Sequence, residues 1–389
     1  MIAGCETIRF VSKMNPSRIE RRRTRVLVNA IHARSGGGVT YLRNILPLLA
    51  ADERLEMHLF LMEDQMDLFH PIHQNVRVHL FPTIKGDVVY IAWEQLVVPI
   101  LARVMKADII FSPANFGCIL SDRNIVLLRN ALSVARVEPR IGRWFYWAAL
   151  GVATLISVLR SRKVLAVSVH AVRSLTFGIW WLLKDRTSVV YHGISPLFSP
   201  EPNIRRENFI LIVADIYVQK NFLNFFRAAA EICRHRPDVR IKVAGSPIDA
   251  WYYAETRALI ERQGIADKVD FLGRLPAEKI LDLYRRALML VFPSTAETFG
   301  NPLVEAMACG TPIACSNTSA MPEIVADAAE MFDPFDIDSI TKTCLRVIDS
   351  AELRATLTAR GIERSKNFSW ATSARLTADA LVQANAAKA

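Results

Sequence analysis

The sequence predicts an α/β protein built from two Rossmann-like, doubly wound parallel sheets that face each other across a cleft. Two observations lead to this prediction. Short apolar runs alternate with helical segments along the chain, and the series starts over after a proline-rich segment near residue 200. Strands that alternate with helices are typical of parallel βαβ units. A length of 389 residues also exceeds what one hydrophobic core usually supports.

Composition limits the classes of protein to which the chain can belong. Hydrophobic residues make up 51% and charged residues 22%, which indicates a packed globular protein. The six cysteines show no C-x-x-C spacing, so a zinc site or a disulfide framework is not expected and a cytoplasmic location is favoured. The net charge of +10 suits an anionic membrane surface or nucleic acid. Nucleic acid is not expected as a partner, because the basic residues are dispersed and no recognition motif is present.

Residues 1–24 form a basic leader that precedes the predicted domains. The segment has no apolar core of the kind that a signal peptide carries. Its arginines could contact anionic lipid headgroups. A disordered leader, or a start codon chosen too early, explains the composition equally well, so these interpretations remain open.

The first domain is expected to span residues 25–195. It opens with the β-branched run RVLVNAI, a turn at Gly36, Gly37 and Gly38, and the apolar helix TYLRNILPLLA. Such a turn would let a phosphate or an acceptor approach backbone N–H groups, although a purely structural turn fits three glycines at least as well. Later strands are predicted at MHLFLM, VRVHLF, DIIFSP, NIVLLRN and VLAVSVH.

One apolar run in this domain, residues 144–159, contains no charged residue and has basic residues on both sides. It is shorter than the ~20 residues that a membrane-spanning helix needs. Its aromatic residues at one end and its basic flanks are typical of a helix in the membrane interface. A core helix would have a similar composition, so interfacial, core and spanning interpretations remain open.

The second domain is expected to span residues 196–370, beginning in the linker SPLFSPEPNIRREN. Strands are predicted at NFILIVADI, VRIKVAGSP, VDFLG, LMLVFPS, PIACS and AEMFDP, with helices between them. A last helix, residues 371–386, could cross back onto the first domain.

The stretch STAETFGNPLVEAMACGTP, residues 294–312, follows the apolar strand LMLVFPS. Open α/β sheets bind ligands at the carboxyl ends of their strands. Asn301 is predicted to cap a helix whose first position is Pro302. Glu305 then lies in or next to the first turn, near N–H groups that can bind phosphate oxygens, and Glu297 lies in the loop before it. The two carboxylates could accept bonds from a ligand that carries two sugars around a diphosphate.

The pattern E-x-F-G-x-P-x-x-E-A-M-A-x-G-x-P resembles the donor-site signature of the group 1 (family 4) glycosyltransferases, retaining enzymes with the GT-B fold. The resemblance extends from about Arg25 to about Ala380. It implies that Glu297 holds hydroxyls of the donor sugar, that Glu305 accepts the ribose hydroxyls, and that Lys220 neutralises the diphosphate. Glu297 and Lys220 are thus the expected catalytic residues. The other expected donor-binding residues are Gly37, Gly38, Leu272, Gly273, Phe299, Gly300, Asn301 and Leu303.

Two positions depart from the family pattern. Ala214-Asp215 stands where members often have Gly-Arg, so Lys220 would carry more of the charge, helped by Arg34. Arg129-Asn130 stands where many members have His-Asp, and with His32 these residues are the candidates for the acceptor side.

Two further segments resemble landmarks of the family. AVSVHAV, with Ser168, resembles the last strand of the first domain, and YHG, ending at Gly193, resembles the hinge. Neither a cofactor nor a metal ion is expected. Asp336 and Asp338 form a D-x-D pair, but this spacing alone specifies no metal geometry. Backbone amides and Lys220 would stabilise the leaving diphosphate, which could itself take the acceptor proton.

Two hypotheses about function remain. The first is a hexosyltransferase that uses a nucleotide-diphosphate sugar, with GDP-mannose as the leading candidate, and a polysaccharide or lipid-linked glycan as acceptor. The second is a catalytically inactive GT-B protein that binds nucleotide sugar or glycan as a scaffold. The intact glutamates and Lys220 favour the first, and the two departures keep the second open. An interfacial helix at residues 144–159 would attach the protein peripherally to the inner face of the cell membrane.

Overall fold

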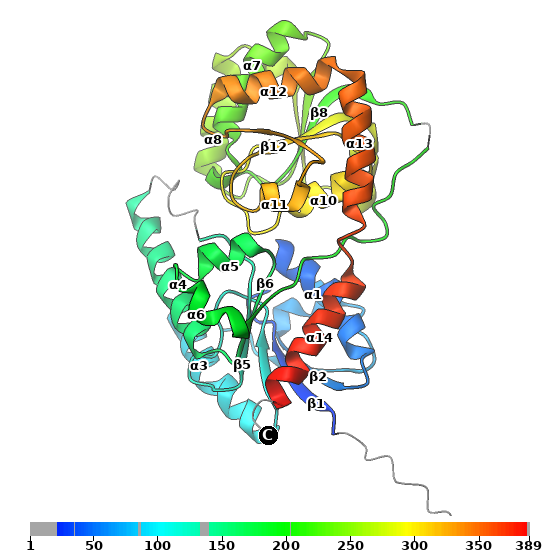
Figure 1. Cartoon of the computed structure of the whole chain (residues 1–389). Helices are drawn as coiled ribbons and strands as arrows, with labels where there is room; N and C mark the ends of the chain where they lie inside the picture. Colours follow the sequence, from blue (N-terminus) through cyan, green and yellow to red (C-terminus); the bar gives the residue numbers. More distant parts are fainter. Residues whose placement is uncertain (1–21, 35, 85–86, 133–139, 203, 387–389) are drawn as a thin grey trace, which may run out of the picture.

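Each half of the chain folds around one parallel sheet, and the two resulting domains lie one above the other (Figure 1). The computed structural model describes residues 22–34, 36–84, 87–132, 140–202 and 204–386. Most of the predicted leader, residues 1–21, lies outside the described residues. The two doubly wound sheets confirm the predicted α/β fold class.

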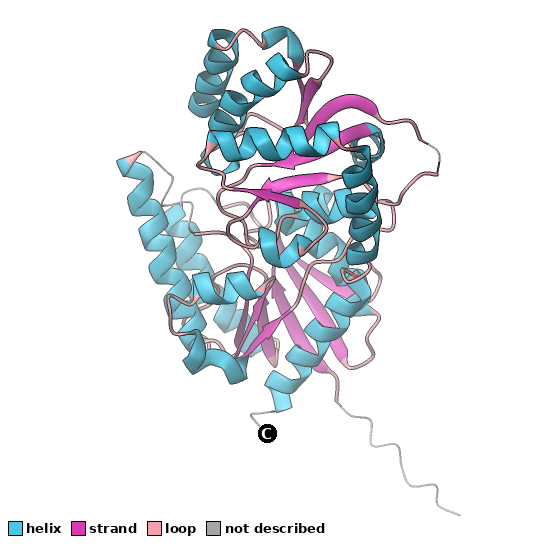
Figure 2. Cartoon of the chain, turned by 45° about the horizontal axis from the view of Figure 1, so that its top comes forward, coloured by secondary structure: helices cyan, strands magenta, loops and turns pink. Residues whose placement is uncertain are grey.

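The first sheet has the strand order β3-β2-β1-β4-β5-β6-β7, and all neighbouring strands are parallel. Its strands are β1 (Thr24–Asn29), β2 (Leu55–Met62), β3 (Val76–Phe81), β4 (Ile109–Ser112), β5 (Asn124–Leu128), β6 (Lys163–Ala166) and β7 (Thr187–Val189). The helices are α1 (Gly36–Ala50), α2 (Met66–Phe69), α3 (Asp87–Val104), α4 (Ile141–Arg160), α5 (Val169–Leu175) and α6 (Trp180–Leu183). Helices lie on both faces of this sheet (Figure 2), which explains why its central strands are apolar almost throughout.

The second sheet has the strand order β10-β9-β8-β11-β12-β13 and is also parallel. Its strands are β8 (Glu207–Val213), β9 (Arg240–Ala244), β10 (Val269–Gly273), β11 (Ala287–Phe292), β12 (Ile313–Ser316) and β13 (Glu330–Phe332). The helices are α7 (Phe222–His235), α8 (Ala250–Arg262), α9 (Ala277–Arg286), α10 (Asn301–Ala308), α11 (Met321–Val325), α12 (Ile337–Asp349) and α13 (Ala351–Ser365). Asp336, from the D-x-D pair, caps α12, because its carboxylate accepts bonds from the N–H groups of Asp338 and Ser339.

The strand order reverses in the middle of each sheet. β1 lies between β2 and β4, and β8 lies between β9 and β11. The loops that leave such neighbouring central strands diverge, which opens a crevice at the carboxyl ends of the strands. The segment with Lys220 follows β8, and the segment with Glu297 follows β11. The fold therefore brings these two distant segments together.

The chain passes between the domains twice, and the two passages lie side by side. Ile194 forms a parallel bridge with Ser369, just before α14 (Trp370–Ala386). Glycine is needed at position 193, because a Cβ atom there would lie 2.1 Å from the backbone N of Trp370. α14 then packs against α1 and β1 of the first sheet (Figure 1).

Two local predictions in the first half are wrong. Residues 36–38 form the first turn of α1 rather than a turn that precedes it. Ser168 does not mark the last strand of the domain. Its hydroxyl caps α5 by accepting a hydrogen bond from the N–H of Ala171 at 2.9 Å, and β7 follows later.

The apolar run at residues 144–159 lies within α4. None of the helices that the structure describes combines the length and apolar content needed to traverse a bilayer, which contradicts the spanning interpretation. α4 is not a core helix either, because Trp144 is 50% and Phe145 is 64% exposed. The interfacial interpretation stays a prediction.

Candidate active site

Two side chains from separate loops meet at the junction of β8 and β11. The Nζ atom of Lys220 donates a hydrogen bond to Oε1 of Glu297 at 2.5 Å. The side chains are 12% and 13% exposed, so water screens this ion pair only weakly. Burial by itself lowers the pKa of Lys220, but the neighbouring Glu297 and Tyr217 outweigh burial and raise the pKa above its ordinary value. Lys220 is therefore a cation at any physiological pH.

The loop between β11 and α10 holds this pair in place. Gly300 has a left-handed backbone with φ of 92° and caps α10, so the prediction of Asn301 as the cap is wrong by one residue. Asn301 instead begins the helix, and its Oδ1 lies 3.1 Å from Nδ1 of His192 in the hinge. The ring of Phe299 is buried, and its centroid lies 5.0 Å from that of His192. The backbone that follows Glu297 is thus fixed against the hinge.

A cleft of ≈ 450 Å³ separates the two domains and contains this pair. The first domain contributes Gly37, Arg129 and Asn130 to its walls, and the second contributes Lys220 and Glu297. The predicted residues Phe299, Gly300 and Asn301 line it as well. A cleft of this size with several converging polar groups is typical of a small-molecule site.

Arg129 is a second cation in the cleft. Its Nε donates a hydrogen bond to the carbonyl oxygen of Pro113 at 2.6 Å. A Cβ atom on Gly38 would lie 2.3 Å from its Nη2, so glycine at that position makes room for the guanidinium. Burial lowers the pKa of Arg129 to about 10. It forms no ion pair with a carboxylate in the part of the chain that the structure describes, so an anion in the cleft would be its counter-ion.

Glu305 lies apart from Glu297. It is the fifth residue of α10, next to the first turn as predicted, and it lines a small separate cavity of ≈ 40 Å³ next to the hinge. Burial raises the pKa of Glu305 to about 7, although a hydrogen bond from the Tyr284 hydroxyl at 3.0 Å acts in the opposite direction. Asn301 lines both cavities.

Comparison with known proteins assigns the second domain. Residues 196–364 match the family model of the glycosyl transferases group 1. This match identifies residues 196–364 as a glycosyl transferases group 1 domain.

Relatives and solved structures agree with this assignment. The chain is 41% identical over 112 residues to the O-antigen chain mannosyltransferase B of Escherichia coli, and this segment covers 29% of each protein. It is 26% identical over 363 residues to an uncharacterized glycosyltransferase of Methanocaldococcus jannaschii, covering 89% of this chain and 94% of that protein. HepE of Anabaena in complex with UDP-glucose has a TM-score of 0.72 at 18% identity, over 92% and 99% of the two chains. This likeness shows the GT-B fold.

The acceptor-side candidates separate in the structure. Arg129 and Asn130 line the cleft, whereas His32 is not among the residues that line it. The Nε2 atom of His32 lies 3.1 Å from Oε2 of the fully buried Glu94, and its ring packs edge-on against Phe116. These contacts give His32 a structural role beside β1.

The departure at Asp215 has a local explanation. Its Oδ1 accepts a hydrogen bond from the N–H of Ser246 at 2.8 Å, and its Oδ2 lies 3.8 Å from Nη2 of Arg274. The carboxylate is thus engaged within the second domain. Arg34, which was expected to help Lys220, is paired with Asp64 and does not line the cleft.

Other predicted donor-binding residues lie outside the cleft lining. Leu272 and Gly273 end β10, which is separated from β8 by β9. The side chain of Leu303 is fully buried, and its backbone N–H already donates to the carbonyl oxygen of Gly300 at 3.0 Å. Gly38 contributes by accommodating Arg129.

Among the cleft residues that the sequence analysis missed are His192, Gln219 and Trp147. His192 was considered only as part of the hinge segment, yet it contacts Asn301 and Phe299, and burial lowers its pKa to about 4. Gln219 directly precedes Lys220, a position that could have suggested it. Trp147 was considered only as part of the apolar run at residues 144–159, and no local signal points it toward the cleft.

Proposed function

We propose that the chain transfers a hexose from a nucleoside-diphosphate sugar to a glycan acceptor, with retention of configuration and without a metal ion or cofactor. The observation that carries this proposal is the interdomain cleft, where the Lys220–Glu297 pair faces Arg129, a cation without a protein counter-ion in the described chain. A diphosphate in this cleft would meet both cations and the N-terminal end of α10. Mannose is the first candidate sugar because one relative is a mannosyltransferase, which makes GDP-mannose the first candidate donor.

In the proposed reaction, the bond between the anomeric carbon and the diphosphate oxygen breaks, and its electron pair stays on the diphosphate. Lys220 and Arg129 stabilise the negative charge that develops there. The acceptor oxygen bonds to the anomeric carbon on the same face of the sugar, and its proton passes to the leaving phosphate. Glu297, oriented by Lys220, holds hydroxyls of the sugar. This scheme needs no protein base, in keeping with the low pKa of His192.

Glu305 is the proposed acceptor of the ribose hydroxyls. Its carboxyl group hydrogen-bonds to Tyr284 in the free protein and lines the cavity that adjoins the cleft at Asn301. Two hydroxyl donors would favour the ionised carboxylate over the protonated group.

The test is a calorimetric binding panel of GDP, UDP, ADP, TDP and their hexose conjugates without added metal. Wild type is compared with Glu305→Ala and with Glu278→Ala, an exposed carboxylate on α9 that serves as the matched control. Selective binding of one nucleotide, lost only in Glu305→Ala, is expected. The absence of binding across the panel from folded protein would contradict the proposal.

The second candidate function is a catalytically inactive GT-B scaffold that binds nucleotide sugar or glycan. The observation that favours it is that three expected donor-binding residues, Leu272, Gly273 and Leu303, do not line the cleft. Selective nucleotide binding without donor hydrolysis or transfer in the presence of glycan acceptors would support this candidate. We also propose that the protein works at the cytoplasmic face of a membrane, with the outer face of α4 in the interface.

A further inference from the structure

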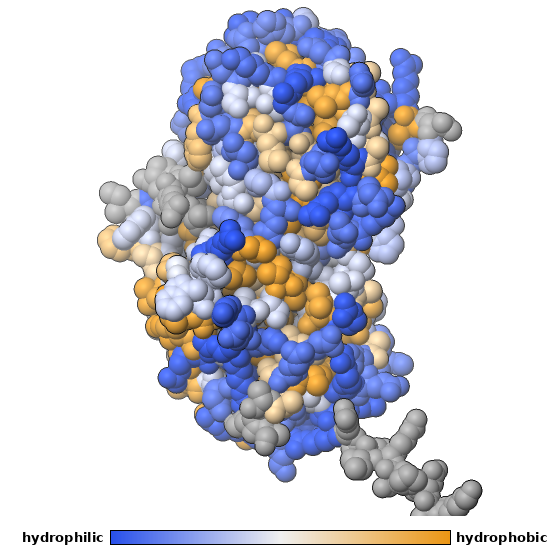
Figure 3. Space-filling view, in the orientation of Figure 1, coloured by the Kyte–Doolittle hydropathy of each residue, from blue (hydrophilic) through white to orange (hydrophobic). Residues whose placement is uncertain are grey.

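The exposed face of α4 is apolar, which is the reverse of an ordinary surface helix. Phe145, Val152 and Leu159 recur at intervals of two helical turns and are all exposed. The opposite face, which packs against the domain, carries the fully buried polar residues Thr154 and Ser157. Figure 3 shows apolar side chains gathered on this flank of the lower domain, where Figure 1 places α4 and α6. The outer face of α4 is therefore suited to an apolar ligand or surface.

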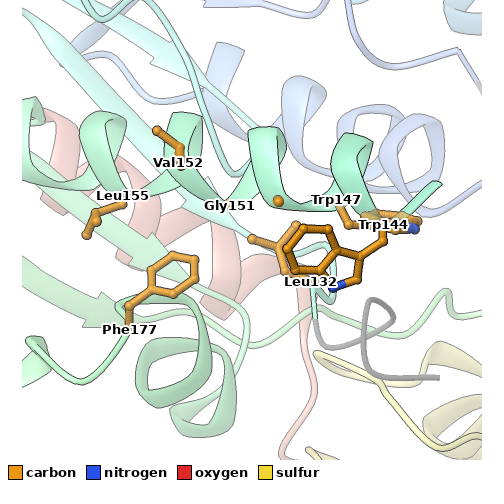
Figure 4. Close-up of a pocket in the computed structure, with 8 residues that line it drawn as sticks. Leu132, Trp144, Trp147, Gly151, Val152, Leu155 and Phe177 are labelled. Atoms are coloured by element: carbon orange, nitrogen blue, oxygen red, sulfur yellow. The ribbon is translucent and has the colours of Figure 1, made fainter. Parts of the chain in front are cut away.

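An apolar groove of ≈ 320 Å³ runs along α4 (Figure 4). The rings of Trp144 and Trp147 lie at one end, and Leu155 and Phe177 lie at the other. Trp147 lines both this groove and the cleft that contains Glu297. The groove and the active-site cleft therefore adjoin each other at this tryptophan.

The surroundings of the groove are basic. Residues 141–183, which include α4, α5 and α6, contain no aspartate or glutamate. Arg160 at the end of α4, Arg173 on α5 and Lys184 after α6 are exposed, and none of them forms an ion pair with a residue that the structure describes. Glu323 of the second domain accepts hydrogen bonds from the first N–H groups of α5, and Asp185 follows Lys184, so an anionic group near the groove would meet more cations than carboxylates.

We propose that this groove binds the apolar chain of a lipid-linked acceptor whose anionic phosphate lies against the surrounding basic residues. The inference rests on the proposed glycosyl transfer and names the class of acceptor for that reaction. The groove meets the cleft at Trp147, so a hydrocarbon chain bound in the groove would hold the sugar end of the acceptor near Glu297. An apolar patch elsewhere on the surface would not have this effect. The volume suits a single hydrocarbon chain better than a folded protein surface, which needs a broad contact area.

The test is calorimetric binding of dodecyl phosphate, below its micelle-forming concentration, to the full chain. Gly151 lines the groove, and a Cβ atom there would lie 3.5 Å from Cζ of Phe177, so Gly151→Leu should fill the groove without a backbone clash. Ala149→Leu adds the same side chain to an exposed position of the same helix that does not line the groove. Leu155→Gln keeps the size of the side chain and makes the groove polar.

Gly151→Leu and Leu155→Gln should each weaken binding of dodecyl phosphate by about tenfold or more, the effect of excluding two methylene groups, while Ala149→Leu binds like wild type. Inorganic phosphate should bind more weakly than dodecyl phosphate by at least the same factor. Equal affinity in all four proteins, equal affinity for the two phosphates, or no binding to wild type would each overturn the proposal. The last result would favour a protein partner for this face.

Nucleotide affinity, measured in the same proteins, separates this inference from the proposed function. It should be unchanged in the three variants, because none of these positions lines the donor cleft. If wild type binds dodecyl phosphate in the groove but binds no nucleotide, the proposed function is refuted while the groove remains a binding site for a hydrocarbon chain.

Discussion

Replacing Arg129 with methionine should stabilise the empty protein and weaken its nucleotide complex. Burial lowers the pKa of Arg129 to about 10, and a shift of this size corresponds to ~3 kcal/mol of unfavourable desolvation. Methionine fills a similar space without the charge. It also removes the hydrogen bond from Nε to the Pro113 carbonyl oxygen, which offsets ~1–2 kcal/mol of the gain. The free energy of unfolding of the empty protein should therefore rise by ~1–2 kcal/mol.

Nucleotide binding should change in the opposite direction. A diphosphate in the cleft would lose one charge-assisted hydrogen bond, which contributes ~1.5–3 kcal/mol, or about 10- to 150-fold in Kd. Arg129→Lys keeps a charge but has no fork for two phosphate oxygens, so its Kd should lie between those of wild type and Arg129→Met. The opposite signs of the two effects identify a binding residue that costs stability in the empty site.

The assays are thermal unfolding of the empty protein and calorimetric titration with the nucleotide that binds best. Arg274→Met removes an exposed arginine of the second domain and should change neither quantity appreciably. A less stable Arg129→Met protein with unchanged nucleotide affinity would refute the reasoning, because Arg129 would then be a structural residue whose charge is compensated within the protein.

Three further predictions concern carboxylates. The pKa of Glu305 is raised from 4.5 to about 7, so stability from its protonated form is present below pH 4.5 and is lost as the pH rises through about 7. If ribose hydroxyls bind the carboxylate, nucleotide affinity should rise up to about pH 7 with proton release, which calorimetry in two buffers measures, and Glu305→Gln should show neither effect. Glu297→Ala should lower kcat far more than it changes the Kd of free nucleoside diphosphate, and should destabilise the protein by ~2–4 kcal/mol, because Lys220 loses its buried partner. If Glu297→Ala weakened nucleoside diphosphate binding by the same factor as it lowered kcat, Glu297 would be assigned to general nucleotide binding. Glu323 accepts bonds from the N–H groups of Val169 and His170 and from the Tyr191 hydroxyl across the domains, so Glu323→Ala should open the cleft and increase the radius of gyration in solution scattering. An unchanged scattering profile would mean that other contacts hold the domains together.

The sequence determined the fold class and the location of the second domain, because both depend on local patterns. Apolar runs of strand length report burial on both faces of a parallel sheet, and the two series of such runs report two sheets. The segment around Glu297 could also be placed at a strand end, since β11 is apolar throughout and a glycine and a proline mark the start of α10. Lys220 and Glu297 could be named individually, but their 2.5 Å contact could not, because it depends on β8 and β11 being neighbours.

Only the tertiary structure decided the roles of Arg129, His192 and α4. Arg129 follows a strand, a position that is often exposed in other proteins. It becomes a candidate binding residue because it is buried in the cleft that Lys220 of the other domain also lines. His192 becomes part of the site because the hinge packs against Phe299 and Asn301. The composition of residues 144–159 fits a buried and an exposed helix equally well. An apolar side chain is expected to avoid water, but its hydrophobicity does not say whether protein or another apolar phase covers it. The neighbours that shield or expose a residue are set by long-range packing, which local sequence patterns do not record.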